Sequence, residues 1–168
     1  MTTRTSPVTS VVAGSAVPGG RTVASTNPAH LDQVVGHVEL AGADVFVAGA
    51  EAARKAQEAW AAVPAPVRGR AIAHIGRLVE DNAEALARLV TAEVGKPYAE
   101  ALGEVREIVD TCDFFLGEGR RLYGQTVPSE MPDKQLFTFR VPVGVAAIVT
   151  AGNFPVAVPA WYRPARDG

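Results

Sequence analysis

The chain has 168 residues, of which 48% are hydrophobic and 20% are charged, values typical of a globular protein that buries a core. Its 16 basic and 18 acidic residues give a formal net charge of −2, so it lacks the basic excess typical of nucleic-acid-binding proteins. The single cysteine excludes an internal disulfide, and the spacing of the three histidines does not favour a metal site.

The first 26 residues contain Ser, Thr, Pro and Gly throughout. Gly14, Pro18 and Gly20 interrupt the apolar stretches, which makes the segment a poor secretory signal. The sequence contains no apolar run of about 18 residues, so we expect no membrane-spanning helix. We predict a flexible N-terminal arm with one short strand over residues 1–26, and a cytoplasmic protein without a membrane partner.

Residues 27–133 predict a mainly helical region. Asn27-Pro28 predicts a turn, because the residue before a proline avoids the helical conformation. A short strand is expected after it, over 34–38. Apolar residues at helical spacing then predict helices over 44–60, 67–94 and 99–117.

Local signals predict where these helices begin, pack and end. Asp44 is the expected N-cap of the first helix, and small residues on one of its faces predict close packing with Trp60 as the anchor. Asp81-Asn82 divides the long second region into two helices. Gly95 predicts its C-terminal end, because glycine is favoured just after the last helical turn.

The helix expected over 99–117 has a polar face and an apolar face. Glu100, Glu104 and Glu107 recur at helical spacing, so we expect them to form a solvated face. Cys112 lies on the apolar face with no histidine nearby in the sequence. This position favours a buried core thiol over a nucleophile.

The pattern of the chain changes after Pro132. Residues 135–141 alternate as a β-strand does, and residues 143–149 form an apolar run typical of a strand buried on both faces of a parallel sheet. A loop over 150–155 and the start of a helix over 156–161 follow. This order predicts the beginning of a parallel α/β unit.

The loop between that strand and that helix is the candidate ligand site. Such loops present backbone amides to nucleotides in α/β folds, and Gly152 lets a ligand approach the backbone closely. Asn153 carries a neutral amide that can donate a hydrogen bond to a developing oxyanion. From the residues alone, an ordinary turn in which Asn153 caps the next helix or stabilises the turn is the favoured interpretation.

Several motifs, taken in their order along the chain, resemble the N-terminal part of the aldehyde dehydrogenase superfamily. They are Asn27-Pro28, the helix ending at Trp60, Glu93-Val94-Gly95-Lys96-Pro97, Arg140-Val141-Pro142-Val143-Gly144-Val145 and Asn153-Phe154-Pro155. The resemblance covers residues 27 to about 162. It implies an α/β fold made of N-terminal helices, the first strands of a Rossmann-like cofactor domain and part of the oligomerisation hairpin.

The resemblance also implies an oxidoreductase that converts an aldehyde into a carboxylic acid with NAD or NADP. By carry-over, Asn153 is the catalytic residue that helps hold the oxyanion. The cofactor is expected along the segment Val149, Thr150, Ala151, Gly152 and Asn153. Most family members carry Pro-Trp where this chain has Ala151-Gly152, so we expect mainly backbone contacts to the cofactor.

The resemblance divides the chain into five segments. After the arm over 1–26 come the helical part of the cofactor-binding domain over 27–133, an oligomerisation-type strand over 134–143, the start of the Rossmann-like unit over 144–162 and an atypical tail over 163–168. The change from an apolar helix to this charged tail is what we expect of a truncated or frameshifted product.

Family members are about three times as long as this chain, and their cysteine nucleophile and water-activating glutamate follow the matched part. We therefore expect the chain to be inactive by itself. An aldehyde is the expected substrate, and a homo-oligomer or a full-length homologue is the expected protein partner. The alternative is a non-catalytic module that pairs with a full-length homologue through its edge strand.

Two further details of the resemblance concern the cofactor and the substrate. Lys96 belongs to the Gly-Lys-Pro motif and is not the lysine with which the family binds its cofactor. Pro128-Ser129-Glu130 and residues 153–158 are similar to the aminoadipate-semialdehyde branch of the family, which gives a hint about the substrate.

Overall fold

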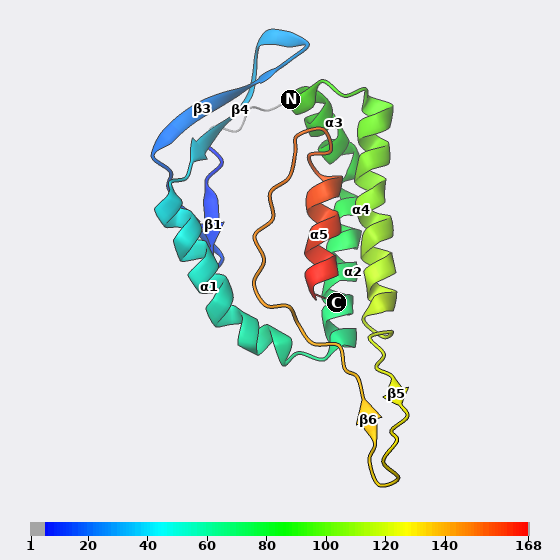
Figure 1. Ribbon diagram of the computed structural model, residues 1–168. Helices are drawn as coiled ribbons and strands as arrows, with labels where there is room; N and C mark the ends of the chain where they lie inside the picture. Colours follow the sequence, from blue (N-terminus) through cyan, green and yellow to red (C-terminus); the bar gives the residue numbers. More distant parts are fainter. Residues whose placement is uncertain (1–5, 168) are drawn as a thin grey trace.

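The computed structural model describes residues 6–167. The helices are α1 (Ala43–Ala61), α2 (Ala65–Asp81), α3 (Ala83–Val94), α4 (Tyr98–Glu118) and α5 (Ala157–Asp167). The strands are β1 (Ser10–Val12), β2 (Ser15–Val17), β3 (Arg21–Asn27), β4 (His30–Leu40), β5 (Thr126–Val127) and β6 (Leu136–Phe137). Figure 1 shows α2 to α5 packed side by side. Helix α1 and the N-terminal strands lie across from these helices, on the other side of the segment that connects β6 to α5.

The hydrophobic core lies between the packed helices. Its buried side chains come from α2, α3 and α4 and are Ile72, Ala87, Val90, Ala101, Val105, Ile108 and Cys112. Val156, just before α5, contacts both parts of this core. The loop that carries Asn153 is therefore attached to the core through the residue just before the next helix.

The helix boundaries agree with the sequence pattern except at one N-terminus. The break at Asn82 and the end of α3 at Gly95, which has a left-handed φ of 72°, are confirmed. The prediction that Asp44 is the N-cap is wrong, because α1 begins at Ala43 and its N-cap is Gly42. Asp44 instead lies in the first turn, where a carboxylate interacts favourably with the helix dipole.

Helix α1 does not pack closely through its small-residue face. None of its residues is buried, and the Trp60 residue is 37% exposed. The helix packs against β1 and not against the core. Its C-terminal end is held by Arg68 of α2, whose Nη1 donates to the carbonyl oxygen of Ala61 at 3.4 Å and to that of Val63, just after the helix, at 3.0 Å.

The N-terminal region contains more strand than the flexible arm that the sequence predicts. Residues 10–27 include three strands: β1 pairs with β2, and β3 pairs with β4 in an antiparallel hairpin. Composition does not reveal this pairing, because it does not show which segments satisfy their backbone hydrogen bonds by pairing with a neighbouring strand. Residues 1–5 of the expected arm lie outside the described residues.

The two strands predicted near the end of the chain differ most from the structure. The expected strand over 135–141 is reduced to β6, which pairs with β5. The expected buried strand over 143–149 has no strand geometry, and Val143 and Val149 are 83% and 94% exposed. A parallel strand is defined by its neighbours, and no described strand pairs with these residues.

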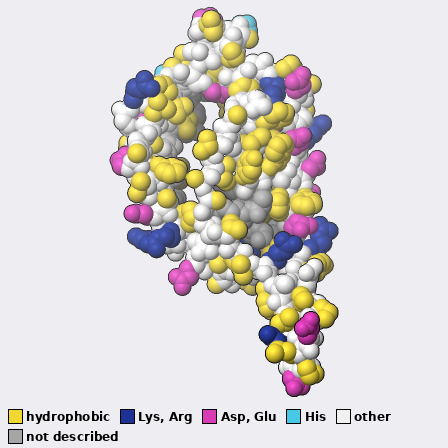
Figure 2. Space-filling view, viewed as in Figure 1, with side chains coloured by type: hydrophobic (Ala, Val, Ile, Leu, Met, Phe, Trp, Pro, Cys, Tyr) yellow, Lys and Arg dark blue, Asp and Glu magenta, His cyan; other side chains and the backbone are white. Residues whose placement is uncertain are grey.

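The connecting segment, residues 138–150, runs between α1 and the packed helices (Figure 1). Val145 and Ile148 line a mainly apolar hollow of about 370 Å³ together with residues of β1 and α1. Figure 2 shows hydrophobic side chains gathered on this face of the molecule. After the connecting segment, α5 continues to Asp167, so the predicted atypical tail has helical backbone over 163–167.

No helix among the described residues is long and apolar enough to cross a membrane. The cytoplasmic location stays a prediction.

We expect the substitution Gly95→Ala to lower the free energy of unfolding by about 1–2 kcal/mol, because an L-residue is strained at this positive φ. A Cβ at this position would also lie 2.9 Å from Cγ of Pro28. Urea denaturation followed by circular dichroism measures the change. Gly103→Ala in α4 is the matched control, because a Cβ there meets no atom within 4 Å. Equal stability of the Gly95→Ala variant and the original chain would contradict the prediction.

Candidate functional site

The segment predicted to contact the cofactor lies at the surface. Residues 149–153 are exposed, with a turn at Gly152-Asn153. A Cβ at Gly152 would meet no atom within 4 Å, so the space beside this part of the backbone is open. The exposed backbone of residues 149–153 therefore leaves room for a ligand beside it.

The side chain of Asn153 is available to a ligand. It is exposed and makes no hydrogen bond to any of the residues that the structure describes. It does not cap α5, which was the interpretation favoured by the residues alone. The amino group of its amide can therefore donate a hydrogen bond outward.

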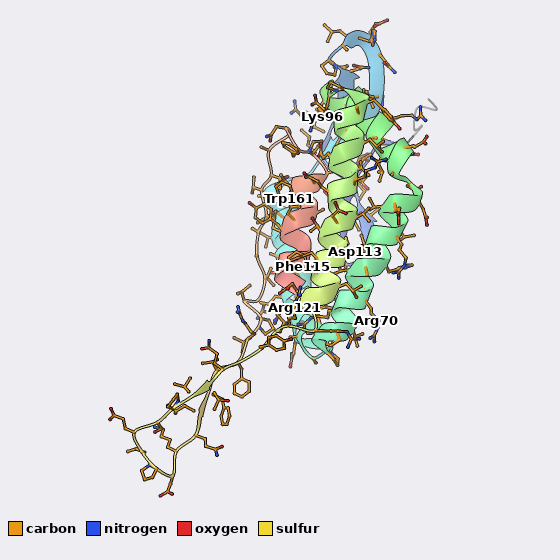
Figure 3. All side chains as sticks on the ribbon, turned by 90° about the vertical axis from the view of Figure 1, so that its right-hand side faces the viewer. Arg70, Lys96, Asp113, Phe115, Arg121 and Trp161 are labelled. Carbon is orange, nitrogen blue, oxygen red and sulfur yellow. The ribbon has the colours of Figure 1, made fainter. Side chains whose placement is uncertain are left out.

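The backbone of Asn153 is fixed by Lys96, which lies between α3 and α4. The Nζ atom of Lys96 donates to the carbonyl oxygen of Asn153 at 2.9 Å and to Oε2 of Glu104 at 2.6 Å. It also lies 4.0 Å from the centre of the Phe154 ring, a favourable cation–π geometry. Figure 3 labels Lys96 near one end of the packed helices.

The second oxygen of the Glu104 carboxylate binds the beginning of α5. Its Oε1 accepts hydrogen bonds from the backbone N–H groups of Val156 at 2.9 Å and Ala157 at 3.2 Å. These are the amides that a helix N-terminus leaves without intrahelical partners. One carboxylate therefore connects α4 to Lys96 and to α5.

An aromatic pair covers the same turn. The Phe154 ring lies 6.4 Å from the Trp161 ring of α5, measured between ring centres. Trp161 is labelled on α5 in Figure 3. Phe154 therefore contacts Lys96 on one side and α5 on another.

The environment of Glu104 favours its ionised form. Burial by itself raises the pKa of this carboxyl group, since the side chain is only 1% exposed. The hydrogen bond from Lys96, the two backbone amides and the positive charge of Lys96 outweigh burial, and together they hold the pKa below its usual value. Glu104 therefore carries a negative charge at neutral pH.

The prediction that Glu104 belongs to a solvated face is wrong. Glu100 and Glu107 are exposed, whereas Glu104 is 3% exposed. Ala101 and Ile108, three residues before and four residues after it, are both buried. Helical spacing therefore placed Glu104 at the edge of the apolar face, and this signal could have identified it.

Cys112 is a core thiol, as the sequence predicts. It is 2% exposed and packs against Gly76 of α2, where a Cβ would lie 2.8 Å from Cβ of Cys112. Burial, followed by the negative charge of Asp113, raises the pKa of the thiol. A buried neutral thiol is a poor nucleophile. No group of three or more metal-ligating side chains lies together in the described part of the chain.

The fold and the turn that carries Asn153 are those of the N-terminal segment of one enzyme family. The family model described as "Aldehyde dehydrogenase family" matches residues 16–165, and the chain belongs to that family. The resemblance drawn from the motifs is thereby confirmed, and so is the expected α/β fold of its N-terminal part.

Three comparisons place the chain within the family. It is 42% identical over 142 residues to aldehyde dehydrogenase family 7 member A1 of Pisum sativum, covering 84% of this chain and 28% of the pea protein. It is 45% identical over 109 residues to alpha-aminoadipic semialdehyde dehydrogenase of Mus musculus, covering 65% and 20% of the two chains. A crystal structure of NAD-dependent aldehyde dehydrogenase from Sinorhizobium meliloti matches with a TM-score of 0.91 and 33% identity, covering 96% of this chain and 33% of that one.

The chain therefore spans less than a third of the length of these relatives.

Proposed function

We propose that this chain supplies the oxyanion-binding turn and part of the cofactor-contacting surface of an NAD- or NADP-dependent aldehyde dehydrogenase. The observation that carries the proposal is Asn153. Its amide points to no protein partner among the described residues, whereas its backbone is fixed by Lys96. Stabilisation of a developing oxyanion requires a donor that is held near open space, and the fixed backbone of Asn153 supplies this placement.

The residues of this segment have separate roles in the proposed reaction. Asn153 donates a hydrogen bond to the oxygen of the aldehyde as negative charge develops on it. Residues 149–152 present backbone groups to the cofactor, and Gly152 leaves room for close approach. When bound, NAD or NADP accepts the two electrons that the aldehyde loses. An aldehyde of the aminoadipate-semialdehyde type is the substrate that we propose to test first, because the mouse relative is named an alpha-aminoadipic semialdehyde dehydrogenase.

We further propose that the chain does not turn over aldehydes by itself. Covalent aldehyde oxidation requires a thiolate nucleophile, and the one cysteine of the chain is buried with a raised pKa. The proposal therefore needs the remaining catalytic groups from another polypeptide or from a longer form of this one.

The experiment compares the purified chain with an exchanged enzyme, the pea relative in which residues 16–165 of this chain replace the matching segment. We expect the exchanged enzyme to reduce NAD or NADP with an aldehyde panel, and the chain alone to produce no reduced cofactor. Turnover by the chain that Cys112→Ser abolishes would contradict the proposal. A folded exchanged enzyme without activity would also contradict it.

A second candidate function is a non-catalytic module that binds a full-length homologue. The β5–β6 hairpin favours it, because the hairpin extends away from the packed helices (Figure 1) and exposes Met131, Phe137 and Phe139. We expect the module to co-purify with a full-length homologue and Phe137→Lys to abolish that association. A hairpin variant that binds as well as the original chain would exclude this function.

A further inference from the structure

The Lys96 ammonium group has an unusually complete set of contacts for a lysine near the surface. Its side chain is only 14% exposed. It donates to Oε2 of Glu104 and to the carbonyl oxygen of Asn153, and it lies against the face of Phe154. An ammonium group has three donors, so two of them are used by acceptors from two distant parts of the chain.

Glu104 completes the arrangement from the other side of the turn. Its Oε2 binds Lys96, whereas its Oε1 binds the amides of Val156 and Ala157. The Lys96–Glu104 pair therefore holds the backbone both before and after Pro155. The residues between these two contacts have little freedom to rotate.

We propose that Lys96 is a positioning residue for Asn153: through its bond to the Asn153 carbonyl, and anchored by Glu104, it fixes the backbone from which the Asn153 side chain extends. The inference rests on the proposed oxyanion role of Asn153. It follows from the geometry because the Asn153 side chain has no hydrogen bond of its own in the described part of the chain. The backbone therefore fixes the point from which the amide extends and limits the directions that its rotamers can reach.

Lys96 is the charged side chain that faces Glu104 among the described residues. The apolar cluster that includes Val105, the residue after Glu104, contains Ala87 and Val90 of α3, and Val79 of α2 and Val156 pack against it. Protonation of Glu104 removes the acceptor for the ammonium and weakens the acceptor for the amides. The turn should therefore lose order as the pH falls through the lowered pKa of Glu104.

The test is NMR relaxation of the isotope-labelled full chain, measured at the backbone amides of Asn153, Phe154, Val156 and Ala157. We expect backbone order parameters of about 0.85 in the original chain and below about 0.6 in Lys96→Met. Lys96→Arg should restore the order, because a guanidinium can donate to both acceptors. Lys55→Met, at an exposed position of α1, is the matched control and should change nothing.

The pH dependence separates positioning from general stability. In Lys96→Met, the pH at which the turn loses order should rise, because the nearby positive charge and hydrogen bond that lower the pKa of Glu104 are gone. In the original chain, the turn should lose order at a higher pH than the core around Val105. If Lys96→Met does not fold, this comparison within the original chain decides the question.

Two results would overturn the inference: unchanged order parameters at the turn in folded Lys96→Met, or simultaneous loss of order in the turn and the core on acidification. The proposed function is tested separately. If the turn behaves as expected but Asn153→Ala leaves the exchanged enzyme fully active, Lys96 still orders the turn, and the oxyanion role of Asn153 fails.

Discussion

We expect Glu104→Ala to lower the free energy of unfolding by about 3–5 kcal/mol, the cost typical of removing one partner of a buried ion pair. The substitution leaves the Lys96 ammonium, 14% exposed, without its carboxylate. It also leaves the amides of Val156 and Ala157 without their acceptor. Since a domain is usually stable by only about 5–15 kcal/mol, this loss is large. Urea denaturation at neutral pH measures it.

An exposed pair of the same chemistry gives the control. Glu84 and Arg88 form a salt bridge at 2.8 Å on α3, and their side chains are 74% and 64% exposed. Surface pairs of this kind contribute about 0–1 kcal/mol, so Glu84→Ala should have a small effect. Equal losses in the two variants would show that the burial of Glu104 is not what makes it important.

The same carboxylate predicts the direction of the pH dependence. The pKa of Glu104 is lower in the folded chain than in the unfolded chain, so its contribution to stability is present above the usual carboxyl range of about 4.3. The contribution is lost as the pH falls through the lowered folded value. Glu104→Ala should remove this part of the acid sensitivity. An unchanged stability profile between neutral pH and pH of about 3 would contradict the assignment.

The second large effect is on catalysis. In the exchanged enzyme, Asn153→Ala should lower kcat about 10²–10³-fold, the range found when one oxyanion donor is removed. The side chain makes no hydrogen bond to the described residues, so the substitution should leave stability almost unchanged. Steady-state kinetics with the aldehyde varied measure the effect, and thermal unfolding measures the stability.

Asn82→Ala is the matched control for this substitution. Asn82 is exposed between α2 and α3, and its side-chain nitrogen donates to the Leu78 carbonyl. Surface changes of this kind usually alter stability by no more than about 0.5 kcal/mol, so the variant should stay folded. Because Asn82 lies outside the proposed site, we expect kcat within about twofold of the parent. A similar kcat in the Asn153→Ala and Asn82→Ala variants would remove Asn153 from the proposed reaction.

The candidate site was predictable only in part. Asn153 and the segment 149–153 came from a motif resemblance, because the residues alone favoured an ordinary turn. Glu104 was missed, since a glutamate repeated at helical spacing usually faces water. Lys96 was recognised as part of a motif, but its contact with Asn153 is not visible in the sequence. Residues 96, 104 and 153 meet only after α4 and α5 have packed.

The sequence by itself determined the helices over 65–81, 83–94 and 98–118, because apolar spacing, the break at Asn82 and the glycine at 95 are local signals. It also determined the family, through the order of its motifs. Only the tertiary structure decided which glutamate is buried, what Lys96 binds and whether residues 143–149 form a strand. These features depend on partners distant in the sequence. A charge is desolvated only by the groups that pack around it, and a strand forms only beside another strand with which it pairs.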